Sequence, residues 1–238
     1  MLLLPIAQGG FFRDRSGESG SCVQNNGFCP GWIKDNIGRY VGQPLVEHLE
    51  LVLVSVAAGF LIAFALALLA RRRRWLAAPI SQVTGVLYTI PSLAAFFLLL
   101  PFTGRGFLTA VIALTAYTLV ILFRNIMTGL GNVPPDAVDA GRGMGLSDRQ
   151  VLWRVELPLA VPEIMAGLRI ATTTTVGLAT LAFFAGAGGL GETIYADLRF
   201  KSNVVTAGVV AVLIAVVLDA LLLLVQWAVT PWRRAAAR

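Results

Sequence analysis

The chain has 238 residues, of which 57% are hydrophobic and 13% are charged, with a formal net charge of +6 and a mean hydropathy of +0.76. A soluble globular domain is about one quarter charged, so a soluble protein of this length would have too little polar surface to cover its core. Composition therefore excludes soluble, disordered, fibrous and disulfide-scaffold proteins. Because the apolar runs are continuous and do not alternate with polar residues, we expect an all-α membrane protein rather than a β-barrel.

The first 44 residues are expected to form an extracytoplasmic N-terminal tail. Met1–Phe12 is apolar, but it is too short to span a membrane and lacks the basic start of a signal peptide. Residues 13–36 are polar and are expected to form a loop. They contain Cys22 and Cys29, for which a disulfide is favoured outside the cell, the alternative being two free thiols. Without a nearby histidine these cysteines make a poor metal site, and we expect no metal.

Five apolar runs in the rest of the chain predict five transmembrane helices, because a span needs roughly 20 mainly apolar residues. Gly85, Pro91 and Pro101 interrupt the second span and permit a kink, which could serve a gate or only shape the packing. His48, at the start of the first span, is expected to be an interfacial polar residue. The spans are placed at 49–70, 80–101, 106–126, 167–188 and 204–230, within a membrane domain of residues 45–232.

The basic residues predict the orientation in the membrane. With five spans, 12 of the 19 basic residues fall on one side, including the run Arg71–Arg74, which is favoured as a stop signal over a lipid-binding site. The positive-inside rule then places the N-terminus outside and the C-terminal tail, residues 233–238, in the cytoplasm. The positive charge is thus explained by the lipid bilayer as a partner, and no nucleic acid is expected.

Polar groups inside the spans mark candidates for a translocation path, because they are costly in hydrocarbon. The fourth span carries a run of threonines, whose hydroxyls can line a path or bond the preceding helical turn, and the second role is favoured for most of them. Asp219 is the only carboxylate well inside a span, and a structural pairing with a polar group of another helix or of a partner subunit is favoured. The candidate path residues are Thr89, Ser92, Thr172, Thr175 and Asp219.

The longest polar segment between spans, residues 128–166, is expected to carry the function. A short helix is predicted over Asp136–Arg142. Ser147 and Gln150 have the spacing of a capping box, and a second helix is expected to follow until Pro158 stops it. By spacing alone, the segment could also be an amphipathic hairpin without a partner.

In this loop the sequence resembles the permease subunits of bacterial ATP-binding-cassette (ABC) importers. Their pattern is E-A-A, three residues, G, nine residues and I-x-L-P; here Asp replaces Glu, Gly replaces the second Ala and Val replaces Ile. The resemblance implies a type I importer-like permease whose cytoplasmic coupling-helix loop docks on a separate ATPase. The residues that carry the resemblance, and hence the implied coupling, are Asp139, Ala140, Gly141, Gly145, Val155, Leu157 and Pro158.

Three further stretches resemble the osmoprotectant-uptake branch of that family: Tyr88–Ala94, Leu122–Asn125 and Gly186–Gly191. The resemblance implies a path for a compatible solute such as glycine betaine, choline or carnitine, and a glycine turn under a binding protein. An ABC permease for an amino acid such as methionine is the nearest alternative. An ion-coupled secondary transporter using Asp219 and a membrane scaffold are alternatives from other classes.

The same resemblance implies the partners. The subunit has no phosphate-binding loop, so it is not expected to be an enzyme or to hold a cofactor, and ATP and Mg would bind to two partner ATPase subunits. A second permease copy or a sister permease would complete the path, and an extracytoplasmic solute-binding protein would deliver the solute. The expected location is the bacterial cytoplasmic (inner) membrane, crossed several times.

Overall fold

The structure, a computed structural model, describes residues 20–232, among which no strand occurs. The apolar stretch Met1–Phe12 and the tail 233–238 lie outside the described residues. Some of the α-helices are joined by short helical turns. The π turns are Gly38–Gly42 and Leu152–Glu156, and the 3-10 turns are Arg74–Leu76 and Ala182–Ala185. The α-helices are α1 (Ser21–Gln24), α2 (Pro30–Ile37), α3 (Gln43–Arg72), α4 (Ala77–Thr89), α5 (Ser92–Thr103), α6 (Phe107–Gly131), α7 (Pro135–Gly143), α8 (Asp148–Val151), α9 (Leu157–Ala179), α10 (Leu190–Ala196) and α11 (Lys201–Val229).

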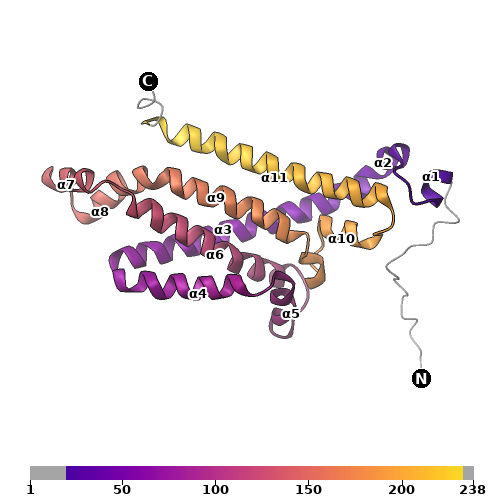
Figure 1. The fold of residues 1–238 in the computed structure, drawn as a ribbon, viewed down its shortest axis with the longest axis horizontal. Helices are drawn as coiled ribbons and strands as arrows, with labels where there is room; N and C mark the ends of the chain where they lie inside the picture. Colours follow the sequence, from indigo (N-terminus) through magenta and orange to yellow (C-terminus); the bar gives the residue numbers. More distant parts are fainter. Residues whose placement is uncertain (1–19, 233–238) are drawn as a thin grey trace.

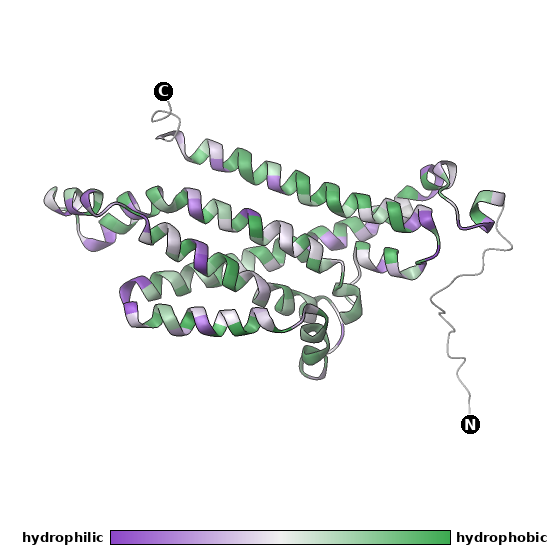
Figure 2. Ribbon diagram, viewed as in Figure 1, coloured by the Kyte–Doolittle hydropathy of each residue, from purple (hydrophilic) through white to green (hydrophobic). Residues whose placement is uncertain are grey.

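The long helices form an elongated bundle (Figure 1). At its centre α3, α6 and α9 pack against one another, α4 packs on α6, and α11 runs along α9. Helices α7 and α8 lie at one end of the bundle, and α1, α2 and α10 lie at the other; these are called below the α7–α8 end and the α1–α2 end. Hydrophilic residues gather at the two ends, whereas the long helices between them are mainly hydrophobic (Figure 2).

Three helices of the described chain are long and apolar enough to cross a membrane: Tyr40–Arg72, Phe107–Gly131 and Lys201–Val229. The second predicted span is bent by 98° between α4 and α5, and this pair would count as a fourth crossing. The bend lies at Ile90 and Pro91, which leave the helical conformation with ψ angles of 126° and 133°. Proline disfavours a helical residue before it, so the kink expected from Pro91 is present as a full break.

The fourth predicted span, 167–188, has different boundaries in the structure. Helix α9 begins at Leu157, ten residues earlier, and ends at Ala179. Glu163 and Arg169 lie inside it, and it is not among the helices that meet the apolarity criterion. The chain then turns through Ala182–Ala185, so the end of the predicted span belongs to a turn and not to the helix.

Small residues let the central helices approach closely. A side chain on Gly59 of α3 would collide with the Thr118 hydroxyl of α6, and one on Gly167 of α9 would collide with Asn125 of α6. Close approach of this kind is what allows membrane helices to gain packing energy where lipid is as apolar as the protein. Two buried apolar clusters result, one including Leu51, Phe96, Leu114 and Leu190 and the other including Phe123, Ile126, Leu157 and Ile164.

The segment 20–37, expected to be a loop, instead forms α1 and α2 and is fastened to the start of α11. A disulfide joins Cys22 to Cys29. The Cys29 backbone N–H donates to Ser202 Oγ at 2.6 Å, and that hydroxyl donates to the Gly27 carbonyl at 3.0 Å. The described part of the tail is therefore packed on the bundle, and the π turn that follows it leads directly into α3.

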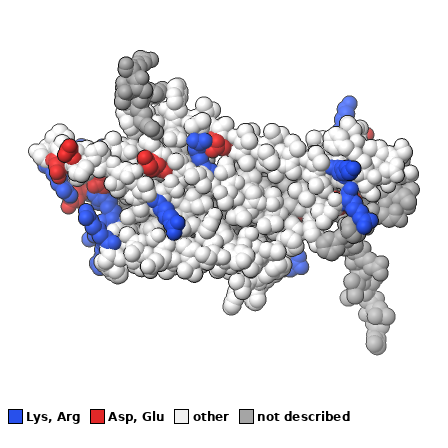
Figure 3. All heavy atoms as spheres, in the orientation of Figure 1, with Lys and Arg blue, Asp and Glu red and all other residues white. Residues whose placement is uncertain are grey.

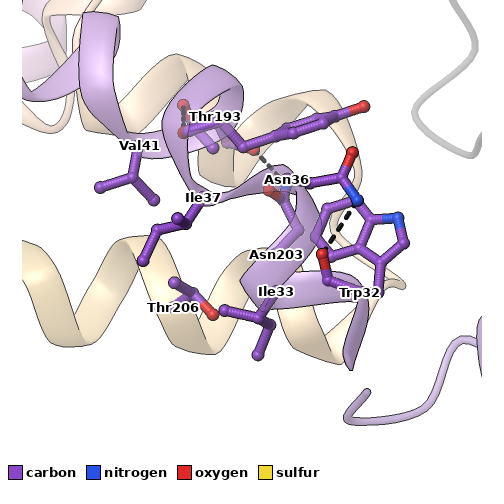
Figure 4. Close-up of a pocket in the computed structure, with 9 residues that line it drawn as sticks. Trp32, Ile33, Asn36, Ile37, Val41, Thr193, Asn203 and Thr206 are labelled. Atoms are coloured by element: carbon purple, nitrogen blue, oxygen red, sulfur yellow. Dashed lines mark hydrogen bonds between the residues drawn. The ribbon is translucent and has the colours of Figure 1, made fainter. Parts of the chain in front are cut away.

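Helix α2 closes a small cavity against α10 and α11 (Figure 4). The Trp32 ring lies edge-on to Phe200 with the ring centroids 4.6 Å apart, and Asn36 Nδ2 donates to the Trp32 carbonyl at 2.9 Å. The cavity volume is about 10 Å³, which holds at most one water molecule. It is too small for a solute. Its lining residues are Trp32, Ile33, Asn36, Ile37, Tyr40, Val41, Thr193, Asn203 and Thr206.

Candidate coupling site and translocation path

The segment between α6 and α9 forms a helical hairpin. Helix α7 has Pro135 in its first turn, where the missing N–H is harmless, and Asp136 beside it, where a carboxylate is favoured by the helix dipole. Helix α8 follows a capping box, in which Ser147 Oγ accepts from the Gln150 N–H at 3.4 Å and Gln150 Oε1 accepts from the Ser147 N–H at 2.9 Å. The predicted short helix and the predicted capping box are both confirmed.

The predicted helix stop at Pro158 is wrong. Helix α8 continues through the π turn Leu152–Glu156 into α9, with Pro158 in the first turn of α9. In a π turn each backbone hydrogen bond spans one residue more than in an α-helix. The regular α-helical hydrogen bonds are therefore already interrupted before Pro158, at the place where proline would otherwise remove one of them and clash with the preceding turn. The hairpin is therefore joined to α9 by continuous helix.

Four of the residues matched to the importer pattern pack the hairpin together. Gly141 and Leu157 are buried, and Val155 and Pro158 are half-buried. A Cβ atom on Gly141 would lie 3.4 Å from Val155 Cγ2, which shows how closely α7 rests on the π turn. These four positions fix the shape of the hairpin and leave little surface for a partner.

The other three matched residues, Asp139, Ala140 and Gly145, are exposed. The Asp139 carboxylate is 74% exposed and lies 3.9 Å from the Arg142 guanidinium. An exposed pair of this kind contributes only about 0–1 kcal/mol, so it leaves Asp139 available to another charge. Gly145 has a φ of 83°, a conformation that favours glycine. The exposed set is the part of the pattern that a partner protein can touch.

An ion pair ties the base of the hairpin to the first span. Arg71, at the end of α3, donates through Nε and Nη2 to the two carboxylate oxygens of Glu156, and the Nη2–Oε1 distance is 2.7 Å. The Glu156 side chain is 11% exposed and the Arg71 side chain 26% exposed. The sequence analysis missed this pair, because Glu156 occupies the variable position of the I-x-L-P pattern and Arg71 was interpreted only as part of a stop signal.

A hollow of about 1100 Å³ opens beside this pair, between α3, α4, α6 and the hairpin. Charged side chains gather at this α7–α8 end (Figure 3). Its basic lining residues outnumber its acidic ones, so the hollow has a positive character. The charged lining residues are Arg71, Arg72, Arg74, Arg142, Arg149, Asp139, Asp148 and Glu156.

The threonine run of α9 faces mainly into the subunit. Thr172 and Thr175 are buried, and their hydroxyls donate to the carbonyls of Leu168 and Ala171 at 2.8 and 2.7 Å. This is the bonding to the preceding turn that the sequence favoured. The structure thus places these two candidate path residues in the packed interior of a single chain.

Thr89 and Ser92 flank the bend between α4 and α5. Thr89 is exposed and Ser92 is half-buried, and the Thr89 hydroxyl donates to the Val86 carbonyl at 2.7 Å. Tyr117 of α6 donates its hydroxyl to the Ile90 carbonyl, which the bend leaves without a helical partner. The structure therefore brings these two candidates together at a break in a span, away from Thr172 and Thr175.

Asp219 of α11 is paired with Arg169 of α9. Arg169 Nε donates to Oδ1 at 2.8 Å and Nη2 donates to Oδ2 at 2.7 Å. The favoured reading of Asp219, a pairing with a polar group of another helix, is confirmed. The sequence did not identify Arg169 as the partner, because the predicted span 167–188 placed it at a membrane boundary.

His48 is fully buried in the bundle, so the expectation of an interfacial residue is wrong. Its Nε2 donates to the Val176 carbonyl of α9 at 3.1 Å. The preceding residue, Glu47, accepts from the Gly189 N–H at 3.0 Å. The start of α3 thereby holds both α9 and the Gly186–Gly191 turn, in which Gly186, Gly188 and Gly189 have positive φ angles. Burial follows from this turn, which folds over the end of α3.

Within residues 20–232, no group of three or more His, Cys, Asp or Glu side chains could hold a metal ion. The features that the described chain does offer are an exposed hairpin, two bidentate ion pairs and a bent span.

Comparison with known proteins agrees with this architecture. A family model described as "Binding-protein-dependent transport system inner membrane component" matches residues 55–234, which include the hairpin but exclude α1 and α2. A solved structure of the MetNI methionine ABC transporter in an inward-facing conformation superposes with a TM-score of 0.71, covering 80% of this chain and 96% of that chain at 24% identity. This likeness supports the fold.

Curated relatives are more similar in sequence. The choline transport system permease protein OpuBB of Bacillus subtilis (strain 168) is 35% identical over 187 residues, which are 78% of this chain and 86% of that protein. The osmoprotectant import permease protein OsmW of Salmonella typhimurium is 36% identical over 210 residues, 84% of this chain and 96% of that protein. The chain therefore belongs to the family of inner membrane components of binding-protein-dependent transport systems.

Proposed function

We propose that this chain is the membrane-spanning permease subunit of an ATP-driven importer of osmoprotectants such as choline, glycine betaine and carnitine. The observation that carries the proposal is the exposed part of the hairpin. Asp139, Ala140 and Gly145 are presented at one end of the molecule, on a hairpin that is continuous with the long helix α9. The solute class is supported by relatives named as choline, carnitine and osmoprotectant permeases.

In the proposed assembly this chain works with two ATPase subunits, a second permease and an extracytoplasmic binding protein. Two ATPase subunits, which would bind ATP and Mg, dock on the hairpins. A second copy of this chain, or a sister permease, completes the path. Only 11% of the most apolar stretch of α11 is buried within the single chain, so most of this helix is available to lipid or to a second permease. An extracytoplasmic binding protein delivers the solute at the α1–α2 end.

The proposed orientation puts the α7–α8 end in the cytoplasm and the α1–α2 end outside. The arginines at the end of α3 and in the hairpin support it through the positive-inside rule. The Cys22–Cys29 disulfide supports it independently, because disulfides persist in oxidising compartments. Residues 1–44 would then be extracytoplasmic, and residues 233–238 would follow α11 into the cytoplasm.

The test is a charge reversal on the exposed hairpin, with a matched reversal at the other end. Asp139→Lys places a positive charge where a basic residue of the ATPase is expected, and loss of an interfacial charge pair costs about 2–5 kcal/mol. Asp35→Lys makes the same change on exposed α2. We expect Asp139→Lys to reduce ATPase co-purification and ATP-driven uptake in proteoliposomes at least tenfold, and Asp35→Lys to leave ATPase co-purification unchanged.

The same proteoliposomes test the solute. Uptake of radiolabelled choline, glycine betaine and carnitine is measured beside uptake of methionine, with ATP inside or outside and with an ionophore present. We expect uptake of at least one quaternary ammonium solute that requires ATP and ignores the ionophore. Normal uptake by Asp139→Lys would contradict the coupling role, and uptake of methionine alone would contradict the solute class.

A further inference from the structure

The Arg169–Asp219 pair lies deep in the apolar part of the chain. Asp219 precedes the end of α11, Val229, by ten residues, which places it roughly 15 Å along the helix axis at 1.5 Å per residue. That is about half the thickness of the hydrocarbon core.

The pair is not enclosed by its own chain. The Arg169 side chain is 29% exposed and the Asp219 side chain 33% exposed. Two N–H groups of the guanidinium bond the carboxylate, and a guanidinium has five. Within residues 20–232, Arg169 makes no other side-chain hydrogen bond. Its remaining donors therefore point to whatever covers this face.

Two of the three possible surroundings conflict with this geometry. Lipid would face an ion pair whose side chains are 29% and 33% exposed, near the bilayer centre, where charges are expensive. A dry interface with an apolar face of a second permease would leave the spare guanidinium donors buried and unbonded, which costs about 1–3 kcal/mol or more for a charged group. A water-filled path satisfies every donor, because water or a polar solute can accept from them.

From this geometry we propose that the Arg169–Asp219 pair lines the translocation path and is a transit site for zwitterionic solutes that carry a carboxylate and a quaternary ammonium group. The inference rests on the proposed function for the class of solute. The carboxylate of the solute accepts from the spare Arg169 donors. Its quaternary ammonium, which has no N–H to donate, lies against the Asp219 carboxylate by charge alone.

The pairing also limits how tightly a solute is held. Because Arg169 and Asp219 already neutralise each other, the pair presents little net charge, and a zwitterion that binds beside it gains little net free energy. Weak binding is what passage requires, since a solute must leave the site as readily as it enters. Thr173, one turn from Arg169 on the same face of α9, donates to the Arg169 carbonyl at 3.0 Å and is half-buried, so it reports on the same surface.

The first measurement asks whether water reaches this face. The chain has two cysteines, and both are in the disulfide. Thr173→Cys therefore gives this chain a single free thiol, and the measurement is made on the assembled importer. We expect a small hydrophilic methanethiosulfonate reagent to modify it, and saturating glycine betaine during turnover to slow the modification. Val217→Cys is the control: it is 54% exposed in the single chain but lies two residues from Asp219, on the opposite side of α11, and we expect no modification.

The second measurement removes the charges without leaving one unpaired. Replacing both partners by leucine is tolerated by many folds, so the Arg169→Leu, Asp219→Leu double variant is expected to assemble and to hydrolyse ATP. We expect it to import glycine betaine at least tenfold more slowly than the wild type.

Two results would overturn the transit site. One is wild-type import of glycine betaine by the double leucine variant. The other is that the hydrophilic reagent fails to modify Thr173→Cys even when no solute is present, and this result decides the matter even if the leucine variant does not assemble. Failure of the proposed function is recognised separately, because wild-type proteoliposomes would then show no ATP-dependent uptake at all.

Discussion

The Arg71–Glu156 pair is expected to set how firmly the hairpin is attached to the first span. Arg71→Met keeps the unbranched apolar stem of the side chain but removes two charge-assisted hydrogen bonds to the Glu156 side chain, which is 11% exposed. Breaking a buried pair from one side costs about 3–5 kcal/mol. Arg71 is 26% exposed at a helix end, so water can reach the vacated carboxylate, and we expect a loss nearer to ~2 kcal/mol. That is roughly a 30-fold shift between paired and separated states.

The control for this change lies two residues away. Arg73→Met removes the same charge from the same run, but Arg73 is exposed and makes no ion pair within the described residues. A double-mutant cycle with Glu156→Gln, measured by unfolding in mixed micelles, isolates the pair energy. The solute imported per ATP hydrolysed measures the coupling. We expect Arg71→Met to lower both the free energy of unfolding and the solute imported per ATP hydrolysed, and Arg73→Met to lower neither. Equal effects of the two variants would refute the reasoning.

Three further predictions concern the α1–α2 end. Gly191→Ala places a Cβ atom against the Thr180 backbone carbonyl, whereas the Cβ atom of Gly208→Ala on α11 meets no atom within 4 Å. We expect Gly191→Ala to yield little folded protein in detergent. We expect Gly208→Ala to have the size-exclusion profile of the wild type. Replacing both Cys22 and Cys29 by serine removes a short cross-link whose chain-entropy contribution is about 2 kcal/mol. We expect lower thermal stability of that variant, and we expect the reduced wild type in intact cells to react with a membrane-impermeant thiol reagent. Reaction only after lysis would contradict the proposed orientation.

Hydrophobic runs predicted most of the long helices, and the importer pattern predicted the hairpin, because both signals are local; the fourth span was misplaced, since α9 covers Leu157–Ala179. The apolar runs specify where helices lie, and the capping box at Ser147 and Gln150 specifies where α8 begins. The breaks and joins were predicted less well. Pro91 produces a full bend, whereas Pro158 lies within a continuous helix. The difference comes from the π turn before Pro158, which no single residue type predicts.

The long-range partners could not be predicted from sequence for a different reason. Glu156 and Arg71 are 85 residues apart, and Arg169 and Asp219 are 50 residues apart. Opposite charges alone leave many pairings open, and only the packing of α9 between α3 and α11 selects these two. The sequence predicted His48 at the membrane interface because the turn that covers it, Gly186–Gly191, is far away along the chain.

Both ion pairs involve the helix that continues the hairpin, and this has a mechanical consequence. A partner that pulls on α7 must either move α9 as a whole or bend the chain at the π turn Leu152–Glu156, where the helical ladder is irregular. The Arg71–Glu156 pair lies at that turn and opposes bending, because a bend would separate two well-aligned hydrogen bonds. With the pair intact, displacement of the hairpin is transmitted along α9 to the Arg169–Asp219 pair and thus to α11. Without it, bending at the turn absorbs the displacement, so Arg71→Met is expected to preserve ATPase docking while lowering the solute imported per ATP hydrolysed.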